Sequence, residues 1–466
     1  MMRNNSKPSK TVSKKKKTST VKTPKKTPNT VTPCKVNVIY LDNNGTTKLC
    51  KDGKDAMVTW LDSRANPSSD SIIAKKSKEL MTCARKYMAK HCGAAYSKYS
   101  FVFTSGASES NCFILRSVVD AYKKHTGKKP HIITSATEHK SIIQCCNSLK
   151  TNGNASITYI EPNAYGCISP DLVKKAITSN TALISIIAAN NELGCINDIK
   201  NVGDIARSHK IPFHTDAVQL FGKYKMPMVK SNIDALSMSF HKLYGPMGLG
   251  MLVISNDLID GYDLKGQISG TQQNELRGGT ENVPAVAAAI ASVKHTFTNR
   301  DSKNKKLYLQ KKQILFELEK VLPQGKYKNY FEKKNPTRNE FVVMGPECNN
   351  SYKNPNVLPN TLLISFVKNV PLEGEGYIPF CNAELKKCLN RKNIIISIGS
   401  ACSTSSKKAS HVLYSIKAPE RIRQGVIRVS LSDNTTSAEI STFMKELISG
   451  IRKQMPLDDD KKSSKK

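Results

Sequence analysis

Short apolar segments with the composition of strands recur along this chain of 466 residues, and polar clusters follow several of them. Helical stretches separate the segments, so strand and helix alternate. The clearest such segments are 101–103, 131–135, 181–187, 211–213 and 233–237. This alternation predicts an α/β fold with helices packed on a sheet. In such sheets ligands bind at the carboxyl ends of the strands, so the polar clusters predict a site at that edge.

The stretch 213–250 carries the polar groups with the most specific chemistry. Asp216 follows an apolar run, Gln219 comes shortly after it, and His241 and Lys242 precede a turn-rich Gly-Pro-Met-Gly. A carboxylate, an amide and a fixed lysine suit an aldehyde cofactor such as pyridoxal 5′-phosphate (PLP). The lysine would form the Schiff base, and the carboxylate would hold the proton on the pyridine nitrogen. A surface lysine in a loop is the competing interpretation of Lys242.

A second candidate lies where the strand 101–103 runs through Gly106 and Ser108 into a helix. Backbone N–H groups and a hydroxyl at a helix N-terminus bind anions, which predicts a phosphate site. Ordinary capping of the helix by Ser108 is the alternative.

Four further polar residues have both a functional and a structural interpretation. His139 and Asn191 follow strands, Arg428 alternates with apolar neighbours in the strand 426–431, and Cys402 lies among small residues. A histidine or asparagine at a strand end is often structural, and an arginine can be an edge charge. Small neighbours suit a mobile nucleophilic cysteine, although an exposed thiol would have the same surroundings.

The formal charge of +35 favours an anionic partner, for instance tRNA, another nucleic acid or an acidic protein. Residues 1–35 contain eleven of the 72 Lys and Arg residues and no Asp or Glu, so we expect a disordered tail there. Simple solubilisation by this tail is the alternative. The basic runs lack interleaved aromatic residues, which gives little support to a dedicated nucleic-acid site.

The cysteine pattern and the hydropathy of the chain indicate the cellular compartment in which it would function. The thirteen cysteines form no C-x-x-C pair, which argues against a structural zinc site and a disulfide framework. Reduced thiols in a reducing, intracellular compartment are expected, with a cytoplasmic location, and mitochondrial or nuclear locations stay open. No segment approaches the roughly 20 apolar residues of a membrane span, so no membrane association is expected.

Ten blocks of the chain, taken together, resemble the cysteine desulfurases of the NifS/IscS type, which are PLP enzymes of the class-V aminotransferase group. The resemblance covers about residues 37–450. The blocks, in order, are YLDNNGTT (40–47), NPSS (66–69), FTSGASESN (103–111), TEHKSI (137–142), NNELG (190–194), HTDAVQ (214–219), SFHKLYGPMGLG (239–250), RGGTEN (277–282), GSACST (399–404) and IRVSL (427–431).

The resemblance implies a fold-type-I PLP transferase with a large and a small domain. The large PLP-binding domain, residues 49–292, is expected to hold a mainly parallel seven-stranded sheet flanked by helices. Residues 37–48 and 293–455 would form a smaller α+β domain carrying the catalytic cysteine loop, and residues 323–357 are expected to be an insertion. A Lys-rich tail (1–36) and a loose charged tail (456–466) would flank the domains.

The resemblance also implies a role for each matching residue around the cofactor. Lys242 would form the Schiff base, Asp216 would pair with the pyridine nitrogen, and His139 would stack on the ring. Gln219 and Asn191 would lie near the phenolic oxygen. The implied phosphate ligands are Ala107, Ser108, Ser239 and His241, together with Thr280 from the other subunit of a homodimer.

The implied substrate is L-cysteine, with Arg428 and Asn191 holding its carboxylate. Lys242 or His139 would move the Cα proton, and Cys402 would accept the sulfur as a persulfide. The products would be L-alanine and sulfur for a sulfur-acceptor protein of iron–sulfur cluster assembly or tRNA thiolation. No resident metal is expected, although Cys402 could contact an iron–sulfur cluster transiently.

Rival functions follow from specific departures. A selenocysteine lyase or another class-V PLP enzyme would share most of these residues. A weakly active sulfur-relay or nucleic-acid-binding scaffold is suggested by the charge and by residues 270–274. There Gly-Thr-Gln-Gln-Asn replaces the family's Gly-Gly-Gln/His-Glu-Arg.

Overall fold

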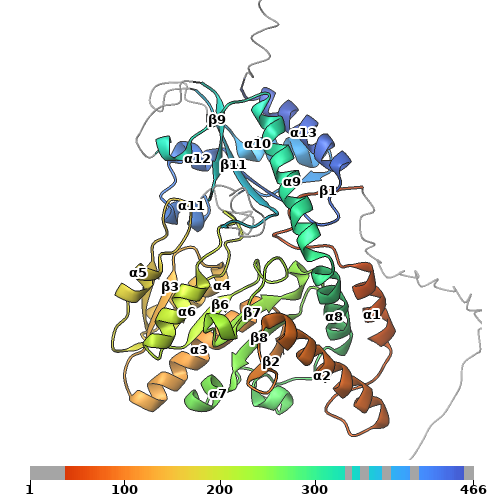
Figure 1. Cartoon of the computed structure of the whole chain (residues 1–466), viewed down its shortest axis with the longest axis vertical. Coiled ribbons are helices and arrows are strands. Elements are labelled where there is room, and N and C mark those ends of the chain that lie inside the picture. Colours follow the sequence, from red (N-terminus) through yellow and green to blue (C-terminus); the bar gives the residue numbers. More distant parts are fainter. Residues whose placement is uncertain (1–36, 331–337, 347–355, 370–378, 399–408, 456–466) are drawn as a thin grey trace, which may run out of the picture. The chain divides into compact units, whose positions relative to one another are not determined.

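The computed structural model describes residues 37–330, 338–346, 356–369, 379–398 and 409–455. The predicted tails at 1–36 and 456–466, and Cys402, lie outside these described residues. The chain from Val38 onward forms one compact unit, and the following description concerns that unit (Figure 1).

A seven-stranded sheet forms the larger half of this unit, with the strand order β2-β8-β7-β6-β5-β3-β4. Only β8 is antiparallel to its neighbours, and every other pairing is parallel. The mainly parallel seven-stranded sheet expected from the sequence is therefore confirmed. Its strands are β2 (Tyr99–Thr104), β3 (His131–Ser135), β4 (Ser156–Ile160), β5 (Thr181–Ser185), β6 (Phe213–Asp216), β7 (Ala235–Ser239) and β8 (Gly250–Ser255).

Helices cover both faces of this sheet, which explains why its central strands are buried throughout. Alternate residues of one strand enter different cores: Phe101 and Phe103 join one cluster and Val102 joins the other. The first cluster brings in α2 (Ile72–Cys92), α5 (Pro170–Lys175), α6 (Ile199–Ser208) and α8 (Val283–Phe297). The second brings in α3 (Ala107–Thr126), α4 (Lys140–Thr151) and α7 (Asn256–Tyr262).

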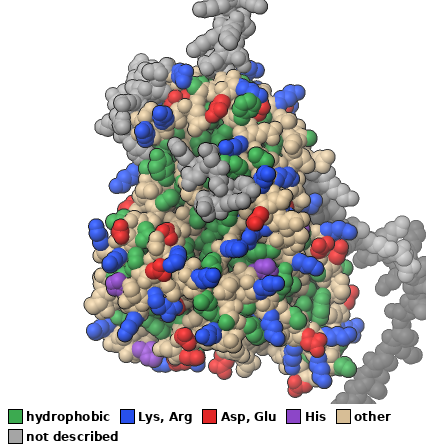
Figure 2. All heavy atoms as spheres, in the orientation of Figure 1, with side chains coloured by type: hydrophobic (Ala, Val, Ile, Leu, Met, Phe, Trp, Pro, Cys, Tyr) green, Lys and Arg blue, Asp and Glu red, His purple; other side chains and the backbone are tan. Residues whose placement is uncertain are grey.

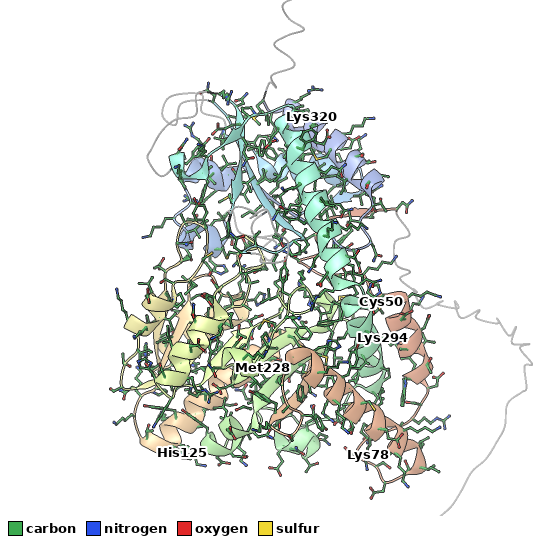
Figure 3. All side chains as sticks on the ribbon, viewed as in Figure 1. Cys50, Lys78, His125, Met228, Lys294 and Lys320 are labelled. Carbon is green, nitrogen blue, oxygen red and sulfur yellow. The ribbon has the colours of Figure 1, made fainter. Side chains whose placement is uncertain are left out.

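Helix α1 (Lys51–Leu61) packs against α8 and begins with a thiol cap. The Sγ of Cys50 accepts a hydrogen bond from the N–H of Gly53 at 3.3 Å. The same sulfur lies 3.4 Å from the Oγ of Ser292 on α8. Figure 3 shows Cys50 beside the end of α8 near Lys294. This cysteine is therefore structural, in line with the prediction of buried, reduced thiols.

The smaller half holds a four-stranded sheet of order β13-β11-β10-β9 and a two-stranded pairing of β1 with β12. Its strands are β1 (Ile39–Tyr40), β9 (Gln324–Gly325), β10 (Glu340–Met344), β11 (Thr361–Val367), β12 (Ile394–Ile395) and β13 (Val426–Ser430). One face packs on α9 (Arg300–Glu319), α10 (Asn382–Arg391) and α13 (Ser437–Arg452). The other face packs on α11 (His411–Ser415) and α12 (Glu420–Gln424). The division into a large and a small domain stays a prediction.

One expectation for the small half is wrong in part. Residues 323–357 were expected to be a surface insertion, but β10 lies within them and pairs antiparallel with β11. Phe341 and Val342 are fully buried. The strand has only five residues, and the charged and Asn/Pro-rich sequence around it shows no strand pattern, so it was not recognised from the sequence.

Membrane-spanning helices are also absent from the part of the chain that the structure describes, because no helix there is both long and apolar enough to cross a bilayer.

Candidate functional site

A cavity of about 600 Å³ opens at the carboxyl ends of the large sheet's parallel strands. This is the edge at which the sequence predicted a ligand site. Residues that follow β2, β3, β5, β6 and β7 line it, together with residues 44–46, Ser410, His411 and Arg428. Of the predicted site residues, the cavity brings together Ala107, Ser108, His139, Asn191, Asp216, Gln219, Ser239, His241, Lys242 and Arg428.

The anion loop, residues 105–108, connects the end of β2 to the 20-residue helix α3. Its Gly106 caps the helix without any side-chain hydrogen bond, so the cap position is formed by backbone alone. Gly250 of β8 lies against the loop, and a Cβ there would come within 2.5 Å of the carbonyl carbon of Gly106. All four loop residues line the cavity, so the N-terminus of α3 lies at the cavity wall, as an anion site requires.

Asp216 at the end of β6 and Lys242, in the turn just after the adjacent strand β7, line the same cavity. The Nζ of Lys242 donates to the backbone oxygens of Asn44, at 2.5 Å, and Gly45. Asp216 is 2 % exposed, and its carboxylate accepts from the amide of Asn111 at 2.9 Å and the N–H of Val218 at 3.0 Å. These two bonds fix the orientation of the carboxylate. Asn111 on α3 was part of the matched sequence block, but its contact with Asp216 was not predicted.

Gln219 has one satisfied and one unsatisfied polar atom. Its Nε2 donates to the backbone oxygen of Asn44 at 3.2 Å. Its Oε1 is buried and has no hydrogen-bond partner among the described residues. Such an unpartnered buried acceptor is costly in the absence of a ligand and so fits a hydrogen-bond donor in the cavity.

Two of the histidines that line the cavity, His139 and His241, have lowered pKa values and so favour the neutral form. Burial is the main cause that lowers the pKa of His139, and the charge of Lys242 contributes. Burial and then the charge of Lys242 lower the pKa of His241 to about 4. The Nδ1 of His139 accepts from the N–H of Ser141 at 3.2 Å and so caps α4. His139 therefore has a structural role at the start of α4 and also lines the cavity, while its role at the cofactor stays a prediction.

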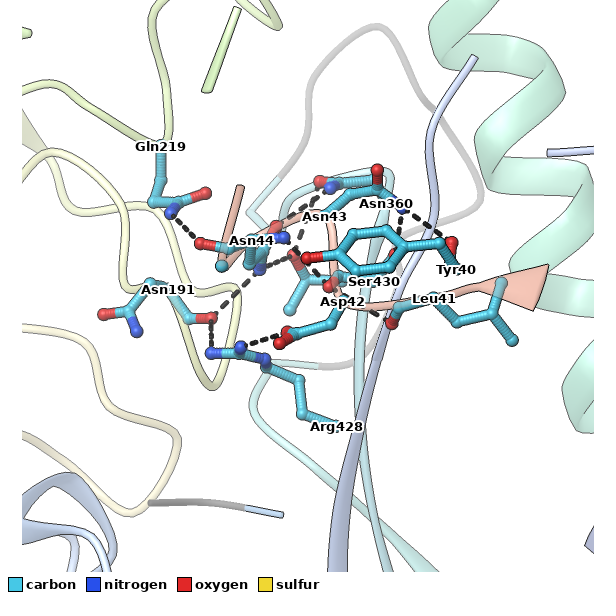
Figure 4. Close-up of polar contacts among 12 residues, drawn as sticks. Tyr40, Leu41, Asp42, Asn43, Asn44, Asn191, Gln219, Asn360, Arg428 and Ser430 are labelled. Atoms are coloured by element: carbon cyan, nitrogen blue, oxygen red, sulfur yellow. Dashed lines mark hydrogen bonds and ion pairs between the residues drawn. The ribbon is translucent and has the colours of Figure 1, made fainter. Parts of the chain in front are cut away.

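Arg428, on β13, is 4 % exposed and reaches the cavity between two partners (Figure 4). Its guanidinium donates to the carboxylate of Asp42 at 2.6 Å and to the backbone oxygen of Asn191 at 3.1 Å. Its Nε is buried without a partner among the described residues. Arg428 is therefore a buried cation that two hydrogen-bond partners fix at the cavity wall, and it is not a solvated charge on the edge of a sheet.

Two buried carboxyl groups near the cavity were not predicted as site residues. Burial is the main cause that raises the pKa of Glu138 to about 8. Burial likewise raises the pKa of Glu192, which lines the cavity and accepts from the hydroxyl of Ser410 at 2.7 Å. Sequence alone gave no signal for them, because a Glu beside a turn is usually solvated.

Two predicted site residues are not placed in the cavity. Thr280 is exposed and does not line it within its own chain. Its predicted contact with the cofactor of a second subunit stays a prediction. Cys402 lies outside the described residues. Within the described ranges, no group of three or more His, Cys, Asp or Glu side chains could hold a metal ion.

The residues present fit PLP. Lys242 supplies an amine, Asp216 a buried and oriented carboxylate, and Gln219 a buried amide at the cavity wall. The anion loop supplies a helix N-terminus for the phosphate.

Comparisons with known proteins agree with this site. The family model described as "Aminotransferase class-V" matches residues 39–349. A "Cysteine desulfurase IscS" of Methanosarcina thermophila is 33% identical over 423 residues, which cover 90% of this chain and 94% of that protein. The relative from Dictyoglomus turgidum is 32% identical over 437 residues, covering 92% of this chain and 99% of that protein.

Solved structures also resemble this chain over most of its length. A "NifS-like protein" from Rickettsia africae has a TM-score of 0.69 and 25% identity, covering 89% of this chain and 99% of that chain. A structure described as "SspA in complex with cysteine" has a TM-score of 0.65 and 32% identity, covering 85% of this chain and 100% of that chain. By sequence and by fold, this chain belongs to the cysteine desulfurases of the class-V aminotransferase family.

Proposed function

We propose that this chain uses PLP on Lys242 to convert L-cysteine to L-alanine and leaves the sulfur as a persulfide on Cys402. The observation that carries the proposal is the meeting of Lys242, the buried Asp216 and the held Arg428 in one cavity. A structural relative that is solved with cysteine supports the choice of substrate.

When bound, PLP supplies an electron sink for the charge that develops at the substrate Cα. Asp216 would keep the pyridine nitrogen protonated, because its carboxylate is fixed by Asn111 and Val218. Gln219, which lines the cavity, would hold the rim of the cofactor beside its phenolic oxygen. The anion loop, together with Ser239 and His241, would bind the phosphate.

Arg428 would bind the substrate carboxylate and so fix the orientation of the Cα–H bond. Its own contacts with Asp42 and Asn191 hold the guanidinium in place before substrate arrives. A preorganised cation loses less conformational freedom on binding than a mobile one.

Lys242 is the group best placed to move the Cα proton. The Nδ1 of His139 already accepts from a backbone N–H, so in the neutral ring the hydrogen resides on Nε2. That tautomer donates and does not accept, which leaves the amine of Lys242 as the base.

Cys402 would attack the substrate Sγ as a thiolate, forming the S–S bond of a persulfide while the Cβ–Sγ bond breaks. The electron pair of the broken bond would take a proton at Cβ, and the amino acid would leave as alanine. We propose that the persulfide sulfur passes to an acceptor protein of iron–sulfur cluster assembly or tRNA thiolation.

The test combines the purified protein with PLP and L-cysteine and measures alanine and sulfide in the presence of a reductant. We expect alanine and sulfide from the wild type, neither from Lys242→Ala, and loss of persulfide in Cys402→Ala with cofactor still bound. A strong preference for selenocysteine that survives Cys402→Ala would instead indicate a selenocysteine lyase. Bound PLP without turnover would support a sulfur-relay scaffold.

A further inference from the structure

The segment 272–277 begins within the stretch 270–274 that departs from the family sequence and ends at Arg277, the first residue of a matching block. It contacts residues on both sides of the anion loop. Gln273 pairs with Phe103, which lies two residues before the loop, and Arg277 pairs with Glu109, the residue directly after it. We propose that Gln273 and Arg277 are positioning residues that hold the anion loop in shape and thereby set the affinity for the phosphate group of PLP. This inference rests on the proposed cofactor.

The contact of Gln273 is made by both ends of its amide. Its Oε1 accepts from the N–H of Phe103 at 2.7 Å, and its Nε2 donates to the carbonyl oxygen of Phe103 at 2.9 Å. Strand β2 is at the edge of the sheet, so these two backbone groups have no neighbouring strand on that side. Arg85 of α2 holds the same amide, since its guanidinium lies 3.4 Å from the Oε1 of Gln273.

The backbone of the segment is strained, and its surroundings maintain it. Gln273, Asn274 and Glu275 all have left-handed conformations, with φ of 51°, 57° and 63°. Consecutive left-handed residues other than glycine are disfavoured and persist only where neighbouring contacts impose them. At the next glycine, a Cβ on Gly278 would lie 2.0 Å from the carbonyl oxygen of Ser269. The segment is therefore packed tightly in a conformation that it would not adopt alone.

The Arg277–Glu109 pair controls the charge beside the loop. One Glu109 oxygen accepts from the N–H of Ser105 in the loop at 2.7 Å, and the other accepts from Arg277 at 3.0 Å. Burial opposes ionisation of Glu109, but the hydrogen bonds from Ser105 and Arg277 outweigh it and lower its pKa. An ionised carboxylate that lines the cavity would repel a phosphate dianion, and Arg277 neutralises it.

The test measures the dissociation constants of the apoprotein for PLP and for pyridoxal, which lacks the phosphate but still reacts with Lys242. We expect Gln273→Ala and Arg277→Gln each to weaken PLP binding about tenfold, as the loss of one or two hydrogen bonds would. Pyridoxal binding and the melting temperature of the apoprotein should stay at wild-type values. Gln267→Ala is the matched control, because Gln267 donates to a backbone oxygen of α3 beyond the loop.

A second variant separates charge from packing. In Arg277→Gln combined with Glu109→Gln, the amide can still accept from Ser105 while the unpaired charge is gone, so PLP affinity should recover toward wild type. Equal weakening of PLP and pyridoxal, or a lower melting temperature with an unchanged affinity ratio, would show that the segment only stabilises the sheet edge. Both constants are measured without L-cysteine, so failure of the desulfurase proposal would not alter them.

Discussion

At the scale of single residues, Arg428 tests the substrate assignment most directly. We expect Arg428→Lys to raise the KM for L-cysteine about 10- to 100-fold, because an ammonium cannot hold Asp42, Asn191 and a substrate carboxylate in one plane. PLP binding should be unchanged, since the guanidinium of Arg428 bonds to Asp42 and Asn191 and not to the anion loop. Steady-state kinetics with a cofactor titration measure both quantities.

Arg423→Lys is the control for this substitution, because Arg423 stacks on Tyr414 and does not line the cavity. An unchanged KM in Arg428→Lys would mean that the guanidinium serves only to link Asp42 to Asn191. A loss of bound PLP would place Arg428 at the cofactor instead of the substrate.

The residues that the sequence could predict are those whose side chains carry distinctive chemistry at strand ends. Lys242 and Asp216 were predicted in this way, and Arg428 was singled out as a charge among the apolar residues of a strand. All three line one cavity. Asn111 and Asp42 act by orienting Asp216 and Arg428, and the partners in the second pair are 386 positions apart in the chain. No local pattern reveals a hydrogen bond over such a separation, so these contacts required the structure.

At the scale of elements, Glu138 ties the ends of two parallel strands together. Its Oε1 accepts from the hydroxyl of Ser135 at the end of β3 and from the N–H of Ile187 just beyond β5, both at 2.7 Å. Its other oxygen is buried and unpartnered among the described residues. The protonated form is therefore favoured, and the pKa rises from 4.5 to about 8.

This raised pKa makes a definite prediction for stability against pH. Between about pH 4.5 and 8 the folded protein retains a proton at Glu138 that the unfolded chain has lost, so the stabilisation declines as pH rises through this window. Glu138→Gln removes the ionisation but keeps an acceptor for Ser135 and Ile187. When the pH is raised from 5 to 8.5, we expect the free energy of unfolding of wild type to fall relative to that of the variant by on the order of 3 kcal/mol.

Denaturant unfolding at several pH values measures this difference, and the exposed Glu161→Gln is the control. Parallel stability curves for Glu138→Gln and wild type would contradict the prediction, because they would mean that Glu138 ionises at the same pH in the folded and unfolded chains.

Element prediction succeeded where a strand and its flanking turns are both distinctive. The segment 131–135, for example, matches β3 in full. Strand β4 was not recognised, and β10 was assigned to a surface insertion because short strands in charged surroundings lack a clear period.

At the scale of the whole molecule, the excess of positive charge is spread widely. Figure 2 shows Lys and Arg side chains over the whole visible face, with Asp and Glu side chains between them. The formal charge of +35 includes +11 from residues 1–36, and the rest of the chain retains +24. Positive charge that is spread over the surface favours general binding of polyanions more than it favours one specific binding site.

Deleting residues 1–36 should therefore weaken binding to polyanions without changing catalysis. Every described residue that lines the cavity lies at position 44 or later, so alanine production from L-cysteine should match that of the full chain. On a heparin column the truncated protein should elute at lower salt, because fewer counterions are released when a less basic protein binds. Elution at the same salt would assign polyanion binding to the compact unit, and loss of alanine production would give the tail a part in catalysis.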